Sequence, residues 1–182
     1  MSRYIAFLRA INVGGRTISM DILRHSFESL SFTHVESFIA SGNIIFESRK
    51  IDKRCMEKEI EEQLRSILGY EVATFIRSDA ELAEIASYSP FPQPLIEAAA
   101  AFNVAFTSEI VDEKSERKLM LLKTDIDDFQ IHKREIYWLC RRKQSESKFS
   151  NAILEKTIGG QSTLRGINTI RKIADKYTHP SE

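Results

Sequence analysis

Short apolar segments and amphipathic segments alternate along the first 78 residues in an order that few folds use. Four apolar runs have the length and composition of buried strands: 4–11, 35–40, 44–47 and 71–77. Between them, apolar side chains recur at helical spacing over 20–31 and again from Met56 to Leu68. The order is β-α-β-β-α-β, the ferredoxin-like arrangement. We therefore predict an α+β protein whose first unit, residues 1–78, is ferredoxin-like.

Residues that begin and end such elements stand where this pattern needs them. Ser19 precedes the first helical segment, and its hydroxyl can accept hydrogen bonds from the free N–H groups of the first turn. Gly69 follows the second helical segment, where a glycine commonly ends a helix. A glycine turn at 12–16 breaks the first strand, and Ser41-Gly42-Asn43 reads as the turn of a hairpin over 35–48.

The second half of the chain, residues 79–182, predicts a smaller α+β unit. Its expected elements are a strand at 102–107, a helix after Asp112, hairpin strands at 129–132 and 136–140, and helices near 148–157 and 164–177. This order echoes the first half, with the final strand replaced by a helix. The only cluster of prolines lies at 89–94, which is the best candidate for a linker or domain boundary.

Charge and cysteine content exclude several classes of protein. Lys plus Arg and Asp plus Glu each number 26, so the net charge of +0 argues against a strongly basic nucleic-acid binder or a membrane-surface protein. The two cysteines, Cys55 and Cys140, form no C-x-x-C pair, which fits a reducing compartment better than a disulfide scaffold. With no signal-like segment and no run near 18 apolar residues, we expect a cytoplasmic protein without a membrane span.

Motifs of known chemistry are missing from the sequence. The four histidines have no second histidine or cysteine at ligand spacing, so we expect no metal site. There is no G-x-S-x-G elbow, and Cys140 sits in an apolar strand, which is typical of a structural cysteine. Gly14-Gly15 follows a strand and precedes a helix, but it matches neither common nucleotide-binding pattern. We therefore expect no cofactor, and the catalytic residues, if there are any, stay unknown.

Two stretches resemble a bacterial family catalogued as domain of unknown function 1697. Residues 4–15 follow its Y-x-A-x-L-R-x-I-N-V-G-G pattern, and residues 38–46 follow its S-G-N hairpin pattern. Near the end, residues 163–170 correspond to its T-x-R-N-W-N-T-V segment, with Gly166 and Ile167 in place of Asn-Trp. The resemblance implies an α+β fold with a ferredoxin-like part, and it implies no activity.

The ferredoxin-like arrangement predicts where a binding site would lie. With right-handed crossovers, the loop after the first strand and the turn between the second and third strands share one edge of the sheet. The helix capped by Ser19 starts there too, and helix N-termini favour anions. Glycines, arginines and asparagines at this edge suit a phosphate or carboxylate. The candidate ligand-binding residues are Arg9, Asn12, Gly14, Gly15, Arg16, Ser41, Gly42 and Asn43, with Arg165 and Asn168 from the C-terminal helix.

These observations favour a cytoplasmic binding module for a small anionic ligand, such as phosphate, a nucleotide or a phosphorylated metabolite. An alternative is an enzyme of unrecognised type. A further alternative is a nucleic-acid or protein interaction domain, but the third strand lacks the aromatic pattern of RNA-binding βαββαβ domains. The basic residues at 133–134 and 141–143 flank one hairpin, as expected for a sheet edge guarded by charge, so nucleic acid is the less favoured partner.

Overall fold

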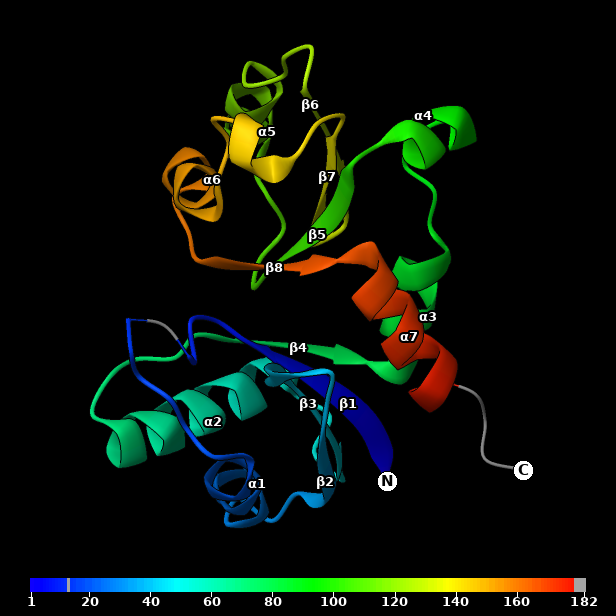
Figure 1. Cartoon of the computed structure of the whole chain (residues 1–182). Coiled ribbons are helices and arrows are strands. Elements are labelled where there is room, and N and C mark those ends of the chain that lie inside the picture. Colours follow the sequence, from blue (N-terminus) through cyan, green and yellow to red (C-terminus); the bar gives the residue numbers. More distant parts are fainter. Residues whose placement is uncertain (13, 179–182) are drawn as a thin grey trace. The chain divides into compact units, whose positions relative to one another are not determined.

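The computed structural model describes residues 1–12 and 14–178, apart from the side chains at positions 40 and 41. It shows the predicted α+β fold, with two four-stranded antiparallel sheets and helices (Figure 1). The chain divides into two compact units: Met1–Glu84 together with the segment that begins at Ile173, and Ile85–Lys172. The division into domains at 1–78 and 79–182 remains a prediction from the sequence. In the described part of the chain, no helix has the length and apolarity to cross a membrane.

The first unit has the predicted β-α-β-β-α-β order. Its elements are β1 (Ser2–Leu8), α1 (Met20–Glu28), β2 (Thr33–Phe38), β3 (Ala40–Ser48), α2 (Lys53–Leu68), β4 (Thr74–Ser78) and most of α3 (Asp79–Ser87). The strands are arranged β2-β3-β1-β4, and each pairs antiparallel with its neighbours. The ferredoxin-like classification of this unit stays a prediction.

Both predicted helix ends in the first unit are present. The Ser19 hydroxyl accepts a hydrogen bond from the Ile22 N–H at 3.2 Å, which begins α1. Gly69 ends α2 with φ at 76°, and its N–H donates to the Arg65 carbonyl at 2.9 Å. Because both motifs depend on a few neighbouring residues, the local sequence was sufficient to predict them.

Helices α1 and α2 cover one face of this sheet (Figure 1). Phe27 of α1 is fully buried there, and its ring lies 5.5 Å from that of Phe46 and 6.1 Å from that of Phe32, measured between centroids. Phe27 is one of the apolar side chains that recur at helical spacing over 20–31, and its burial agrees with that spacing. Burial of this aromatic cluster is a main contribution to the stability of the unit.

The second unit has the same order of elements and the same strand arrangement. It contains the end of α3, then α4 (Gln93–Ala98), β5 (Ala101–Thr107), α5 (Glu113–Met120), β6 (Asp127–His132), β7 (Glu135–Cys140), the 3₁₀ turn η1 (Gln144–Glu146), α6 (Asn151–Ile158), β8 (Ser162–Gly166) and the start of α7 (Ile167–Tyr177). Its sheet runs β6-β7-β5-β8, with antiparallel neighbours. Strands β5 to β8 thus repeat the arrangement of β1 to β4.

The predicted helix over 164–177 is wrong at its start. Residues 162–166 form β8, and α7 begins only at Ile167. Leu164 lies opposite Ala105 in the sheet, on the face that α5 and α6 cover. Its spacing from Ile167 and Ile170 matches a helix, but the residue pairs with β5 and its partly buried side chain packs against the core of the second unit. The tertiary pairing with β5 therefore makes this segment a strand, although its local sequence pattern is compatible with a helix.

The predicted turn of the first hairpin is also wrong. Positions 41–43 belong to β3, and the chain reverses at Ile39, where Phe38 pairs with Ala40. Ile39 has φ at 67°, in the left-handed region that favours glycine. A β-branched residue gives no turn signal, so the glycine three residues later was mistaken for the turn.

Trp138 of the second unit lies in β7, the strand that the sequence predicts at 136–140. It is buried, and its Nε1 donates to Asp127 Oδ1 at 2.8 Å. The proline segment at 89–94 is mostly at the surface, but Phe91 is buried and its ring packs against Phe102. This segment lies inside the second unit, since the boundary between the compact units falls after Glu84.

Candidate functional site

The predicted site residues of the first unit lie at one end of its sheet. Strand β1 ends at Leu8 and β3 begins at Ala40, and Phe7 pairs with Asn43. The loop that follows β1 therefore leaves the sheet at the end where β3 enters it. Arg9, just after β1, is half-buried, and its N–H donates to the Ala73 carbonyl at 2.9 Å.

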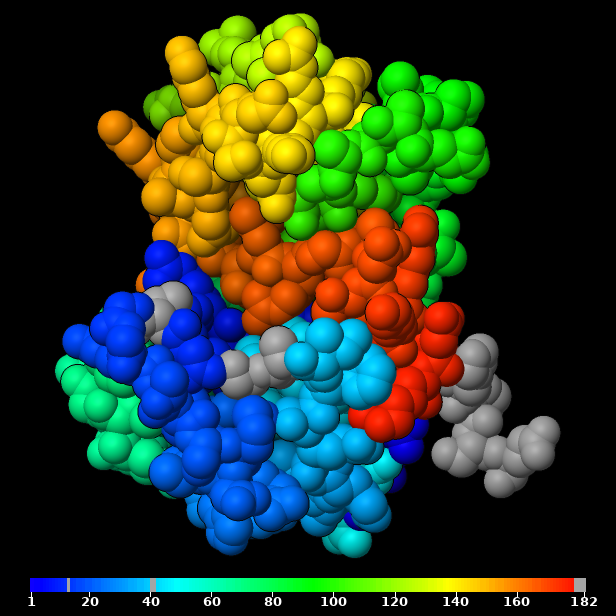
Figure 2. Space-filling model, in the orientation of Figure 1, coloured from blue at the N-terminus to red at the C-terminus, as the bar shows by residue number. Residues whose placement is uncertain are grey.

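The loop between β1 and α1 exposes its backbone. Asn12 closes this loop on itself, because its Oδ1 accepts from the Ile18 N–H at 3.0 Å. Gly14 and Gly15 are exposed and have φ values of 64° and 77°, and a Cβ on either would meet nothing within 4 Å. In Figure 2 the blue N-terminal part of the chain, which includes this loop, is at the surface. A ligand can therefore approach the glycine backbone closely.

Arg16 is held beside this loop by an aromatic ring. Its guanidinium carbon lies 4.6 Å from the centroid of Tyr70, a cation–π distance. The Tyr70 hydroxyl in turn donates to the Ile11 carbonyl at 3.1 Å, which fixes the ring against the loop. Arg16 is exposed, and a stacked guanidinium keeps the N–H groups at its edge for other acceptors. We call residues 12 and 14–16, together with this guanidinium, the glycine–arginine loop.

The N-terminus of α1 is occupied by its own side chains. Ser19 caps the Ile22 N–H, and Asp21 places a carboxylate in the first turn, where it bonds Arg24 at 2.9 Å. A carboxylate there competes with an external anion for the positive end of the helix. The glycine–arginine loop is therefore the part of the predicted site that is best disposed toward a ligand.

The candidate site residues from the hairpin that are described, Gly42 and Asn43, are buried within the first unit. Asn43 is buried, and its Nδ2 donates to the Phe38 carbonyl at 3.1 Å, which ties β3 to the end of β2. Gly42 is buried beside it in β3. The side chain of Ser41 lies outside the described part of the structure. Asn43 is thus directed at the protein backbone and away from solvent.

The last two predicted residues, Arg165 and Asn168, belong to the second unit. Arg165 is in β8, and its Nη1 donates to Thr163 Oγ1 at 2.9 Å and to the Leu164 carbonyl at 2.8 Å. Burial lowers the pKa of its guanidinium to about 10. Asn168 is exposed in the first turn of α7.

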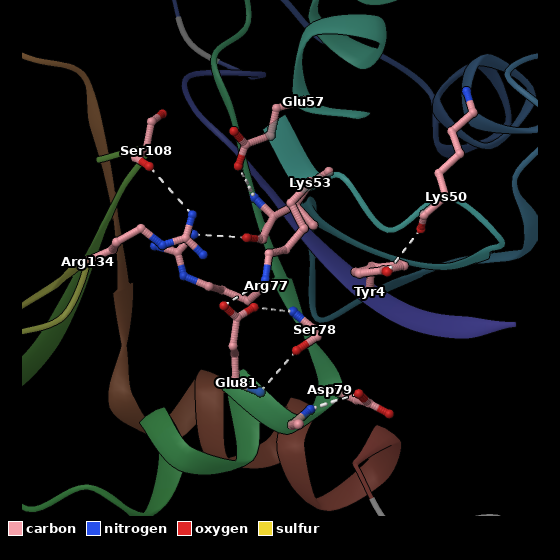
Figure 3. Close-up of polar contacts among 12 residues, drawn as sticks. Tyr4, Lys50, Lys53, Glu57, Arg77, Ser78, Asp79, Glu81, Ser108 and Arg134 are labelled. Carbon is pink, nitrogen blue, oxygen red and sulfur yellow. Dashed lines mark hydrogen bonds and ion pairs between the residues drawn. The ribbon is translucent and has the colours of Figure 1, made fainter. Parts of the chain in front are cut away.

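Sequence reasoning missed a row of carboxylates along β4. This strand is at the edge of its sheet, so alternate N–H groups have no strand to bond. Glu57 Oε1 accepts from the Ile76 N–H, and Glu81 Oε2 accepts from the Ser78 N–H, each at 2.8 Å (Figure 3). Glu61 Oε1 accepts from the Thr74 N–H, also at 2.8 Å. The edge is therefore closed by side chains of α2 and α3.

Glu57 is 1% exposed, although charged residues surround it along α2. Its second carboxylate oxygen pairs with Arg54 at 3.1 Å. One signal was present in the sequence: Glu57, Ile60 and Leu64 recur at helical spacing, so Glu57 shares the face of two core residues. Burial raises the pKa of the neighbouring carboxyl of Glu61, against the opposing effect of the Thr74 N–H.

Among the described residues, no three His, Cys, Asp or Glu side chains gather closely enough to hold a metal ion; His179 lies outside them. The fold and the site define an α+β protein of two β-α-β-β-α-β units with an exposed glycine–arginine loop. The chain belongs to the DUF1697 family, described as a protein of unknown function, whose sequence model matches residues 1–137.

A solved structure supports the fold over nearly the whole chain. A conserved bacterial protein from Streptococcus pneumoniae is 22% identical and has a TM-score of 0.73, and the match covers 98% of this chain and 99% of that one. At this identity the likeness shows the fold alone. A search of the curated proteins finds no match.

Proposed function

We propose that the protein is a cytoplasmic binding module for a small anionic ligand, such as phosphate, a nucleotide or a phosphorylated metabolite. The observation that carries this proposal is the glycine–arginine loop, in which two consecutive exposed glycines with positive φ precede an exposed arginine. Both cysteines are free, as suits a reducing compartment.

The proposed contacts follow from the chemistry of the loop. Glycines at 14 and 15 leave the peptide N–H groups accessible, because no side chain shields them. Arg16 supplies a charge-assisted and geometrically forked donor, which suits phosphate and carboxylate oxygens. Tyr70 holds the guanidinium near the loop and reduces the entropy lost when a ligand binds.

The test is a titration with inorganic phosphate, sulfate and adenine nucleotides, followed by amide NMR shifts. We expect shifts at residues 12 and 14–19 in the wild-type protein and at least a tenfold weaker response in Arg16→Ala. Arg49→Ala is the matched control, because Arg49 is an exposed arginine of the same unit outside the loop. Absence of shifts at tens of millimolar anion, or equal binding by Arg16→Ala, would overturn the proposal.

A further inference from the structure

Asn103 in β5 is a buried side chain whose amide nitrogen has an unused hydrogen-bonding capacity. The residue is 9% exposed, and its Nδ2 has no hydrogen-bond partner within the described chain. Buried polar side chains nearly always have a partner, and an orphaned one points to strain, to a function or to a ligand. The surroundings of Asn103 in the second unit favour a ligand.

Open space lies beside this amide. In the sheet, Asn103 is opposite Trp138 of β7 on one side and Gly166 of β8 on the other. A Cβ placed on Gly166 would come 3.9 Å from Asn103 Oδ1, and apart from its chain neighbours it would meet no other atom within 4 Å. The carboxamide of Asn103 therefore borders a space that the missing side chain at 166 leaves open.

The N-terminus of α7 adjoins the same space. The helix begins at Ile167, directly after Gly166, and runs for 11 residues. The N–H groups of a first turn have no partner within the helix and carry partial positive charge. This first turn contains no acidic residue that would compete with an anion for the helix N-terminus. Asn168 and Thr169 add an amide and a hydroxyl, one exposed and one half-buried.

We propose that the space over Gly166 binds one oxygen of a small oxyanion, a phosphate or a carboxylate. That oxygen accepts from the first-turn N–H groups of α7 and from the amide of Asn103. A 180° rotation of the carboxamide exchanges its nearly isosteric ends, and it turns Nδ2 toward the space. The orphaned donor thereby gains its partner. This site lies wholly in the second unit and does not depend on the glycine–arginine loop.

The sharpest test fills the space with one methyl group. Gly166 is not among the residues with positive φ, so Gly166→Ala fits the backbone without strain. Gly160→Ala is the matched control, because Gly160 lies in the same unit, has no positive φ and has open space around it. Titrating inorganic phosphate should shift the amides of residues 166–170 and the side-chain NH₂ of Asn103. We expect at least tenfold weaker binding in Gly166→Ala and unchanged binding in Gly160→Ala.

A second variant covers the case in which Gly166→Ala perturbs folding. Asn103→Leu removes both polar atoms at similar size, so it should fold and show no phosphate shifts at 166–170. Arg16→Ala separates this proposal from the first one, because it should leave these shifts intact. Wild-type amides at 166–170 that do not move at tens of millimolar phosphate would overturn the inference. Full binding by Asn103→Leu would do the same.

Discussion

Arg77 in β4 and Arg165 in β8 occupy the same position in their two units. Each lies opposite the fourth residue of the unit's first strand, and each donates from Nη1 to the carbonyl of the residue before it, at 2.9 Å and 2.8 Å. The two units therefore share strand register as well as strand order. The sequence shows no residue-level repeat, so the equivalence becomes visible only in the pairing of the strands.

Replacing Arg77 should weaken the first unit. Arg77 is 1% exposed, so Arg77→Ala leaves a cavity and deprives the buried Ile76 carbonyl of its donor. The second effect alone should cost about 1–3 kcal/mol in urea unfolding. Arg77→Lys should recover little, since an ammonium lacks the guanidinium fork. Exposed Arg49→Ala should stay within about 0.5 kcal/mol of wild type, and equal values for the two alanine variants would contradict the prediction.

Glu57 should contribute through its hydrogen bond to the β4 edge. Glu57→Ala leaves the Ile76 N–H without an acceptor in a buried place, which should cost about 1–3 kcal/mol. Glu57→Gln keeps an oxygen for that N–H and should lose less. The control is Glu62→Ala, an exposed glutamate of the same helix. A denaturation series in which glutamine is no better than alanine would show that the charge, and not the acceptor, matters.

Glu61 should make stability depend on pH. Because burial raises its pKa in the folded state, the folded protein holds this proton more tightly than the unfolded chain does. The contribution of protonated Glu61 to the free energy of unfolding is fully present below the ordinary glutamate pKa. It is lost as the pH rises through the pKa of Glu61 in the folded state. Glu61→Gln keeps an acceptor for Thr74 without the charge. Its stability relative to wild type should therefore increase from about pH 4 to about pH 8, and a difference that is flat with pH would refute this.

Elements set by neighbouring residues could be predicted from the sequence. The cap at Ser19, the helix end at Gly69 and the core position of Phe27 each depend on a pattern within one or two turns. The order of strands and helices in the first unit followed from these patterns. Gly14-Gly15 was recognised as part of a turn for the same reason, since glycine readily adopts the positive φ found at both positions.

Elements set by distant pairing could not be predicted in the same way. The spacing of Leu164 suggests a helix, but the residue pairs with β5 as a strand. Ile39 gives no turn signal because it is β-branched, although the chain reverses there with a positive φ. Asn43 looked like a ligand donor, but the Phe38 carbonyl takes up its amide. Asn103 has nothing unusual in its sequence context. The unpaired Nδ2 of Asn103 and its position opposite Gly166 become apparent only in the folded structure.

The second unit is inserted within the first, and this affects how the chain is made. Arg3 near the start of the chain donates to the Tyr177 carbonyl at 2.9 Å, so the first unit joins residues 174 positions apart. The ribosome therefore synthesises every residue of the second unit before it synthesises the last segment of the first unit. During synthesis, strands β1 to β4 can pair before that segment exists, but the Arg3–Tyr177 hydrogen bond can form only after all residues of the second unit have been made.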